Sequence, residues 1–116
     1  MKLIERAELG DVSILSDPEI TVVKDCYGWT ALHALAFRKK REVLKHPEVT
    51  TLKYNNQFYW QCIGATPLHC LAVMRVLKES DLKNLFPWYK HKDIIITYRE
   101  VTEILNTAQS IQYILE

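Results

Sequence analysis

The sequence is poor in glycine, with only three in 116 residues. Gly10, Gly28 and Gly64 lie far apart, so the chain contains neither the dinucleotide-binding motif G-x-G-x-x-G nor the phosphate-binding loop G-x-x-x-x-G-K-[ST]. Both of these nucleotide-binding loops are therefore excluded. A chain of 116 residues, 48% of them hydrophobic, is long enough to bury a core of its own, and we expect a single domain.

The chain also has only three cysteines, no excess of one charge and no long apolar run. Cys26, Cys62 and Cys70 are odd in number and show no C-x-x-C spacing, which favours a reducing compartment over a disulfide framework. Fifteen Lys and Arg balance fourteen Asp and Glu, so a net charge of +1 gives no reason to expect a nucleic acid or an anionic membrane as partner. No apolar run reaches the length of a membrane span, and charges interrupt the first six residues, where a signal peptide needs apolar ones. We expect a cytoplasmic protein.

What the sequence does contain is a repeated motif. Residues 28–36 read GWTALHALA and residues 64–72 read GATPLHCLA, 36 positions later, with matches at Gly, Thr, Leu, His, Leu and Ala. A second pair, residues 14–24 and 43–53, matches at an offset of 29, and residues 77–85 form a weaker third copy. Periods of this size indicate a stacked array of repeats.

Helix start signals accompany the repeats. Thr30 and Thr66 precede apolar runs of helical spacing, as N-cap residues do, and Pro67 stands at the first helical position, where its missing N–H costs nothing. Thr97 and Glu100 have the spacing of a capping box. The apolar stripe that follows them with helical period consists of Val101, Ile104, Leu105, Ala108, Ile111 and Leu115. These signals predict an all-α protein.

The G-x-T-[PA]-L-H-x-L-A blocks resemble the ankyrin repeat, whose signature contains T-P-L-H-x-A at a period of about 33. The resemblance is strongest over residues 25–72, although Asp17-Pro18 and His46-Pro47 replace the usual Asn-Gly after the outer helix. It implies a short ankyrin-like helical-repeat solenoid of roughly four helix pairs, with hairpin fingers and degenerate terminal caps. The resulting division is an N-terminal cap at 1–24, a repeat at 25–53, a repeat with a long finger at 54–86 and a C-terminal cap at 87–116.

The recurring His33 and His69 raise the possibility of a metal site or of catalysis. The resemblance instead assigns each histidine to hydrogen bonds with the capping threonine and neighbouring loop backbone, and no third ligand has suitable spacing. A Cys–His nucleophile pair is also a weak interpretation, because no known catalytic signature surrounds the cysteines and Cys70 falls inside a core-type helix. We therefore expect no enzymatic activity, no catalytic residue, no metal and no cofactor.

Aromatic residues concentrate in the segments between repeats, which we call fingers. The finger from Lys53 to Thr66 is seven residues longer than the one from Lys24 to Thr30, and such insertions lie along one edge of a stacked array. Finger residues predicted to bind a partner are Tyr27, Trp29, Phe58, Tyr59, Trp60, Trp88 and Tyr89. These rings serve either as interface anchors or as packing that closes a small core. Contacts implied by the resemblance on the concave face of the inner helices are Ala34, Phe37, Arg38, Cys70, Val73 and Met74.

The expected function is non-catalytic recognition of a protein partner. One alternative is nucleic-acid binding through the basic residues 38–41 and 90–92 with neighbouring aromatics. We prefer to interpret residues 38–41 as a solvated turn near a helix C-terminus, where cations are mildly stabilising. Another alternative is self-association through the apolar end of the C-terminal helix, residues 111–115.

Overall fold

The computed structural model describes residues 2–55, 64–90 and 96–115, and within these residues the chain is mostly helical. The helices are α1 (Leu3–Glu8), η1 (Val12–Ser16), η2 (Pro18–Thr21), α2 (Ala31–Phe37), η3 (Arg41–Lys45), η4 (Pro47–Thr50), α3 (Pro67–Val73), α4 (Glu79–Leu85) and α5 (Tyr98–Leu115), where η marks a 3-10 helix. The described residues contain isolated β-bridges but no strand. The prediction of an all-α protein is confirmed.

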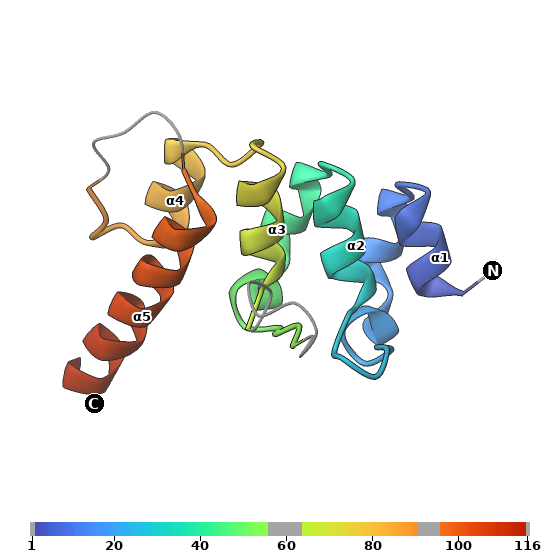
Figure 1. The fold of residues 1–116 in the computed structure, drawn as a ribbon, viewed down its shortest axis with the longest axis horizontal. Helices are drawn as coiled ribbons and strands as arrows, with labels where there is room; N and C mark the ends of the chain where they lie inside the picture. Colours follow the sequence, from blue (N-terminus) through green and yellow to red (C-terminus); the bar gives the residue numbers. More distant parts are fainter. Residues whose placement is uncertain (1, 56–63, 91–95, 116) are drawn as a thin grey trace.

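Three short helices, α1, α2 and α3, stand side by side in a row, and α5 lies along the far side of α3 (Figure 1). The row makes the molecule elongated, with extents of 41 × 28 × 26 Å. Because α2 lies between α1 and α3, its residues 31–36 are all buried. The buried alanines of α2, Ala31, Ala34 and Ala36, leave room for its two neighbours to approach.

Each of the three helices ends in the same left-handed turn. The turn residues are Gly10 (φ 84°), Lys39 (φ 63°) and Arg75 (φ 61°). The N–H of the following residue donates to a helix carbonyl five residues earlier, from Asp11 to Arg6, from Lys40 to Leu35 and from Val76 to Leu71. This is the Schellman pattern of helix termination. The turn residues are 29 and 36 positions apart, which are the two offsets of the sequence repeats.

We call the three repeating segments the first unit (residues 3–21), the second unit (31–50) and the third unit (67–85). In the first two, a pair of 3-10 helices follows the α-helix: η1 and η2, then η3 and η4, at the expected offset of 29. Only in the third unit does a second α-helix, α4, follow.

In the first two units the second helix of the predicted helix pair is thus replaced by two 3-10 helices. The reason is Pro18 and Pro47, which disfavour an α conformation in the residue before them and so interrupt a continuous helix. The preceding side chains, Asp17 and His46, then cap the second 3-10 helix by accepting the N–H of the residue two positions later, at 2.8 and 3.1 Å.

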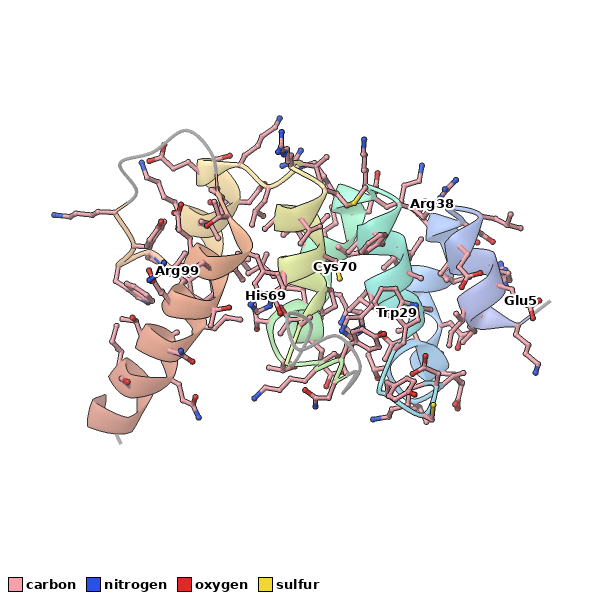
Figure 2. All side chains as sticks on the ribbon, in the orientation of Figure 1. Glu5, Trp29, Arg38, His69, Cys70 and Arg99 are labelled. Carbon is pink, nitrogen blue, oxygen red and sulfur yellow. The ribbon has the colours of Figure 1, made fainter. Side chains whose placement is uncertain are left out.

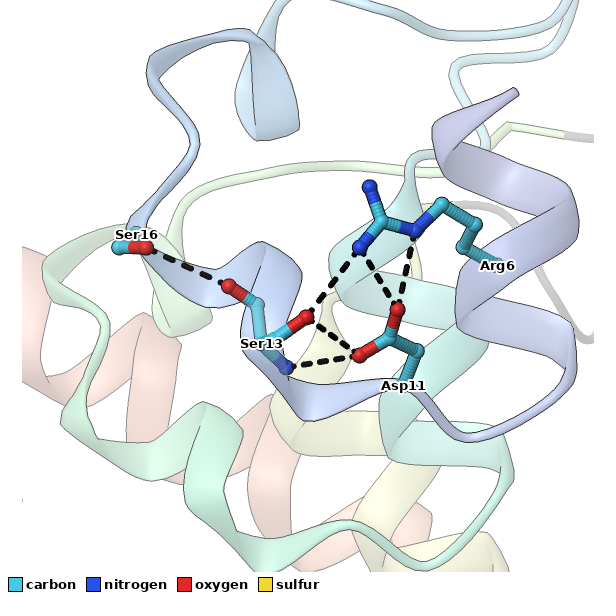
Figure 3. Close-up of polar contacts among 4 residues, drawn as sticks. All are labelled: Arg6, Asp11, Ser13 and Ser16. Carbon is cyan, nitrogen blue, oxygen red and sulfur yellow. Dashed lines mark hydrogen bonds and ion pairs between the residues drawn. The ribbon is translucent and has the colours of Figure 1, made fainter. Parts of the chain in front are cut away.

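A polar cluster fixes the turn of the first unit (Figure 3). Asp11 accepts hydrogen bonds from the backbone N–H of Ser13 at 3.0 Å and from its hydroxyl, and its other oxygen forms an ion pair with Arg6 at 2.8 Å. The hydrogen bonds from Ser13 and Arg6 hold the pKa of Asp11 below its usual value. The Ser16 hydroxyl donates to the carbonyl of Ser13 and extends the cluster along η1.

Two further contacts fix α4 of the third unit and the start of α5. Asp81 forms an ion pair with Arg41 of the second unit at 2.6 Å and also accepts the N–H of Lys78, which caps α4. At the start of α5, the Thr97 hydroxyl accepts the N–H of Glu100 at 3.2 Å, so the predicted N-cap is confirmed. Val101 and Ile104 of the predicted stripe are buried, while Leu105 and Ala108 are partly buried against the core.

The two signature glycines provide a test of the finger geometry. Gly28 (φ 90°) and Gly64 (φ 77°) both have a positive φ, but a Cβ at Gly28 would lie 2.6 Å from the carbonyl oxygen of Lys53, whereas one at Gly64 would meet nothing within 4 Å. We expect Gly64→Ala to lower the free energy of unfolding by about 1 kcal/mol through the left-handed conformation alone. Gly28→Ala adds a backbone clash, so we expect a loss of about 2–3 kcal/mol. Urea denaturation measures both, and equal losses would contradict the packing of Gly28 on Lys53.

Candidate interaction surface

A threonine–histidine pair stands at the start of each of the two inner helices, α2 and α3, where a finger ends. In α2, the Thr30 hydroxyl accepts the N–H of His33 at 3.4 Å, and Nδ1 of His33 lies 3.3 Å from the Thr30 nitrogen and 2.9 Å from its hydroxyl. Nε2 of His33 lies 3.1 Å from the carbonyl of Leu52 and 3.0 Å from that of Ala65. Nδ1 therefore accepts and Nε2 carries the proton. The ring joins the second unit to the base of the next finger.

The same pair recurs at α3, with a different partner beyond it. Nδ1 of His69 accepts the N–H of Thr66 at 3.0 Å, and Nε2 lies 2.8 Å from the hydroxyl of Thr102 on α5. That hydroxyl donates in turn to the carbonyl of Tyr98. The prediction that these threonines cap the helices and that the histidines bond to them and to neighbouring backbone is confirmed, except that His69 reaches a hydroxyl on its outer side.

Burial controls the charge of both rings. It lowers the pKa of His33 and lowers the pKa of His69 from 6.5 to about 4, so both rings are neutral near pH 7. A neutral ring also fits the hydrogen bonds, because a proton on Nδ1 would face the threonine N–H. Among the described residues, no three His, Cys, Asp or Glu side chains come close enough together to hold a metal ion.

An aromatic cluster lies on one side of the second unit. Trp29 stacks on His33, with ring centroids 5.2 Å apart. It also makes T-shaped contacts with Tyr54 and Phe37, at centroid distances of 4.9 and 6.0 Å. Tyr27 meets Tyr54 at 6.5 Å. Trp29 is half-buried and packs against the core, whereas Phe37 at the end of α2 is 47% exposed. Trp29 is thus largely a packing residue, and Phe37 is the part of the cluster that is open to a partner.

Phe37 has a counterpart on the next helix. Val73 stands 36 residues later at the same position of α3, and it is 49% exposed. Arg38 and Met74 follow them; Arg38 is exposed and Met74 is half-buried. These four predicted contacts thus lie at equivalent ends of two packed helices. We call this set of residues at the ends of α2 and α3 the helix-end row; its members are Phe37, Arg38, Lys39, Val73, Met74 and Arg75.

Two predicted contacts are corrected. Ala34 is 2% exposed and Cys70 is 4% exposed, so neither touches a partner. Figure 2 shows the reason for Cys70, which lies on the side of α3 that faces α2, while His69 points toward α5. The helices are so short and so closely flanked that the position taken for a concave face lies within the core.

The longest finger (Lys53–Thr66) and a third one, from Phe86 to Thr97, are only partly described. Trp88 is 38% exposed and packs edge-on against Tyr89, whose hydroxyl donates to Glu100 of α5 at 3.1 Å. Tyr89 therefore helps to fix α5. Other predicted residues lie outside the described residues: Phe58, Tyr59, Trp60, and the basic positions 91 and 92. The side chains of residues 112–115, proposed for self-association, are also not described, and Ile111 before them is half-buried.

A cleft of about 650 Å³ between α3, the base of the long finger and α5 was not expected. Its α5 side presents Thr102, Asn106 and Gln109, and Lys53 closes the opposite side. The spacing of the three α5 residues by four and three positions places them on one helix face. This row of polar residues beside the apolar stripe of α5 is the sequence signal that would have indicated the cleft.

Comparison of the chain with protein-family models, with curated proteins and with solved structures yields no match. No helix in the described part of the chain is both long and apolar enough to cross a membrane. The site is therefore interpreted from its own geometry.

The histidine pairs predict a pH-dependent stability. Because the pKa of His69 is about 4 in the folded protein and 6.5 for an exposed histidine, the unfolded chain binds more protons between these values. We expect the free energy of unfolding to be constant above about pH 6.5 and to fall by about 2–3 kcal/mol from this residue as the pH drops to 4. Urea titrations across this range measure the fall. His69→Gln should be less stable at pH 7 but show a shallower slope, and an unchanged slope would contradict the assignment.

The aromatic cluster predicts two different outcomes for alanine substitution. Trp29→Ala removes contacts with three rings, so we expect the free energy of unfolding to drop by about 2–3 kcal/mol. Phe37→Ala, at an exposed position, should cost less than about 1 kcal/mol. Thermal or urea unfolding of the two variants compares them directly. Equal losses would mean that Phe37 also belongs to the core and is not open to a partner.

Proposed function

We propose that this protein is a non-catalytic protein-recognition module with an ankyrin-like architecture. Three units with one helix-ending turn, spaced by 29 and 36 residues, support the architecture, together with the two threonine–histidine pairs. In a stacked array each unit fixes its neighbour, so side chains along the edge are held in place before a partner arrives. Binding to such an edge loses little conformational freedom.

The single observation that carries the proposal is the exposure of Phe37 and Val73 at equivalent positions of adjacent helices. Each is an apolar side chain about half open to solvent, although its neighbours in the helix are buried. Large apolar side chains that cluster on a rigid surface are typical of interface anchors. The row lies on an open edge rather than in an enclosed cavity, which favours a macromolecular partner over a small molecule.

Selection from a library of random peptides displayed on phage tests this function. We expect the selected peptides to bind the wild-type protein at least about tenfold more tightly than the double variant Phe37→Ser, Val73→Ser. Both positions are exposed, so the melting temperature of the variant should stay within about 4 °C of the wild type.

The matched control is Val22→Ser. Val22, the residue that follows η2, is 61% exposed and does not belong to the helix-end row, so the change removes an exposed apolar side chain of similar kind. Peptides that bind both the wild type and the double variant equally well, or a selection that yields no binders, would contradict the proposal.

A further inference from the structure

The helix-end row carries three cations that have no ion pair within the described residues. Arg38 and Lys39 follow Phe37, and Arg75 follows Val73 and Met74; all three cations are exposed. Their neighbours in the basic run are engaged elsewhere. Arg41 forms its ion pair with Asp81 at 2.6 Å, and the Lys40 side chain lies against the turn at Gly10.

Lys39 and Arg75 occupy positions where the backbone favours glycine. Their φ values are 63° and 61°, and the first unit has Gly10 at the same place. A side chain with a β-carbon is strained in this region, so Lys39 and Arg75 each lower the stability of the turn relative to glycine. Both turns place a cation directly beside an exposed apolar residue, Phe37 or Val73.

We propose that the helix-end row binds an acidic, extended peptide segment of a partner protein. Two apolar side chains of the peptide pack on Phe37 and Val73, and its carboxylates pair with Arg38, Lys39 and Arg75. This inference rests on the proposed function and adds the chemical class of the partner. The charge of the row is complementary to such a segment, which gives specificity and a faster encounter.

The spacing of the row fits one peptide conformation. Packed helices such as α2 and α3 lie about 8–10 Å apart. A polyproline II segment rises about 3.1 Å per residue and returns to the same face every third residue, a repeat of about 9 Å. The peptide therefore carries apolar residues three positions apart with acidic residues between them.

A nucleic acid fits the row less well. One face of the Trp29 ring is stacked on His33, and the ring also meets Tyr54 and Phe37, so the row offers only the ring of Phe37 for a base to stack on. Val73 offers no ring at all.

Fluorescence anisotropy with defined probes tests the proposal. The probes are a labelled peptide EDLEDLED, its neutral analogue QNLQNLQN and a labelled octamer of thymidine. We expect the acidic peptide to bind the wild-type protein about tenfold more tightly than the neutral one, with an affinity that falls as salt is added.

Arg75→Gly is the most informative variant. It removes a cation and relieves the strained turn, so we expect the acidic peptide to bind about three- to fivefold more weakly while the melting temperature rises. Loss of binding in a more stable protein excludes misfolding as the cause. The matched control is Arg99→Gln on α5, far from Arg38 (Figure 2), which changes the net charge equally and should leave the affinity unchanged.

Four results would overturn the inference: equal affinity for the two peptides, no binding of either peptide, an equal effect of Arg99→Gln and Arg75→Gly, or tighter binding of the thymidine octamer that depends on Arg38. The proposed function is tested separately. If selected peptides depend on Phe37 and Val73 without any preference for acidic residues, only the inference about charge fails; if no selected peptide depends on them, the proposed function fails as well.

Discussion

The arrangement of the units depends on a neutral imidazole that bonds in two directions at once. In His33, one ring nitrogen accepts from the N-cap threonine of its own helix, and the other donates to two carbonyls, of Leu52 and Ala65, at the base of the following finger. Capping of a helix and docking of the next unit are thus one interaction. Its strength requires burial, because burial keeps the ring uncharged and the bonds away from water.

From this constraint the placement of the exposed side chains follows. Once the histidine fixes one end of each inner helix, the Schellman turn at the other end falls at a defined place. Phe37 and Val73 are the last residues of α2 and α3, so they lie at equivalent ends of two packed helices. The helix-end row is therefore a consequence of helix length: α2 and α3 are each seven residues long, and in each the last residue is exposed while the six before it are buried.

Local signals in the sequence were sufficient to locate the helix starts and the finger turns. Thr30, Thr66 and Thr97 cap helices as expected, and Gly28 has the positive φ that its position in the motif indicates. Each of these features depends on a few neighbouring residues. The offset of 29 in the sequence likewise corresponds to two equivalent pairs of helices, η1 with η2 and η3 with η4, although their 3-10 form was not expected.

Features that depend on neighbours in space were not predictable in the same way. Ala34 and Cys70 have the spacing of an open helix face, but adjacent helices cover them. The left-handed turns at Lys39 and Arg75 carry no glycine to mark them, so only comparison with Gly10 in three dimensions shows their equivalence. The role of Thr102 as partner of His69 requires the placement of α5, which no local pattern specifies.

The contact between His69 and Thr102 has a consequence for what can pack against α3. Nε2 of His69 offers the same donor to α5 that Nε2 of His33 offers to the next finger, and one rotatable hydroxyl takes the place of two backbone carbonyls. The outer side of a helix that begins with this threonine–histidine pair can thus hold either a helix such as α5 or the base of a finger, because only the acceptor changes.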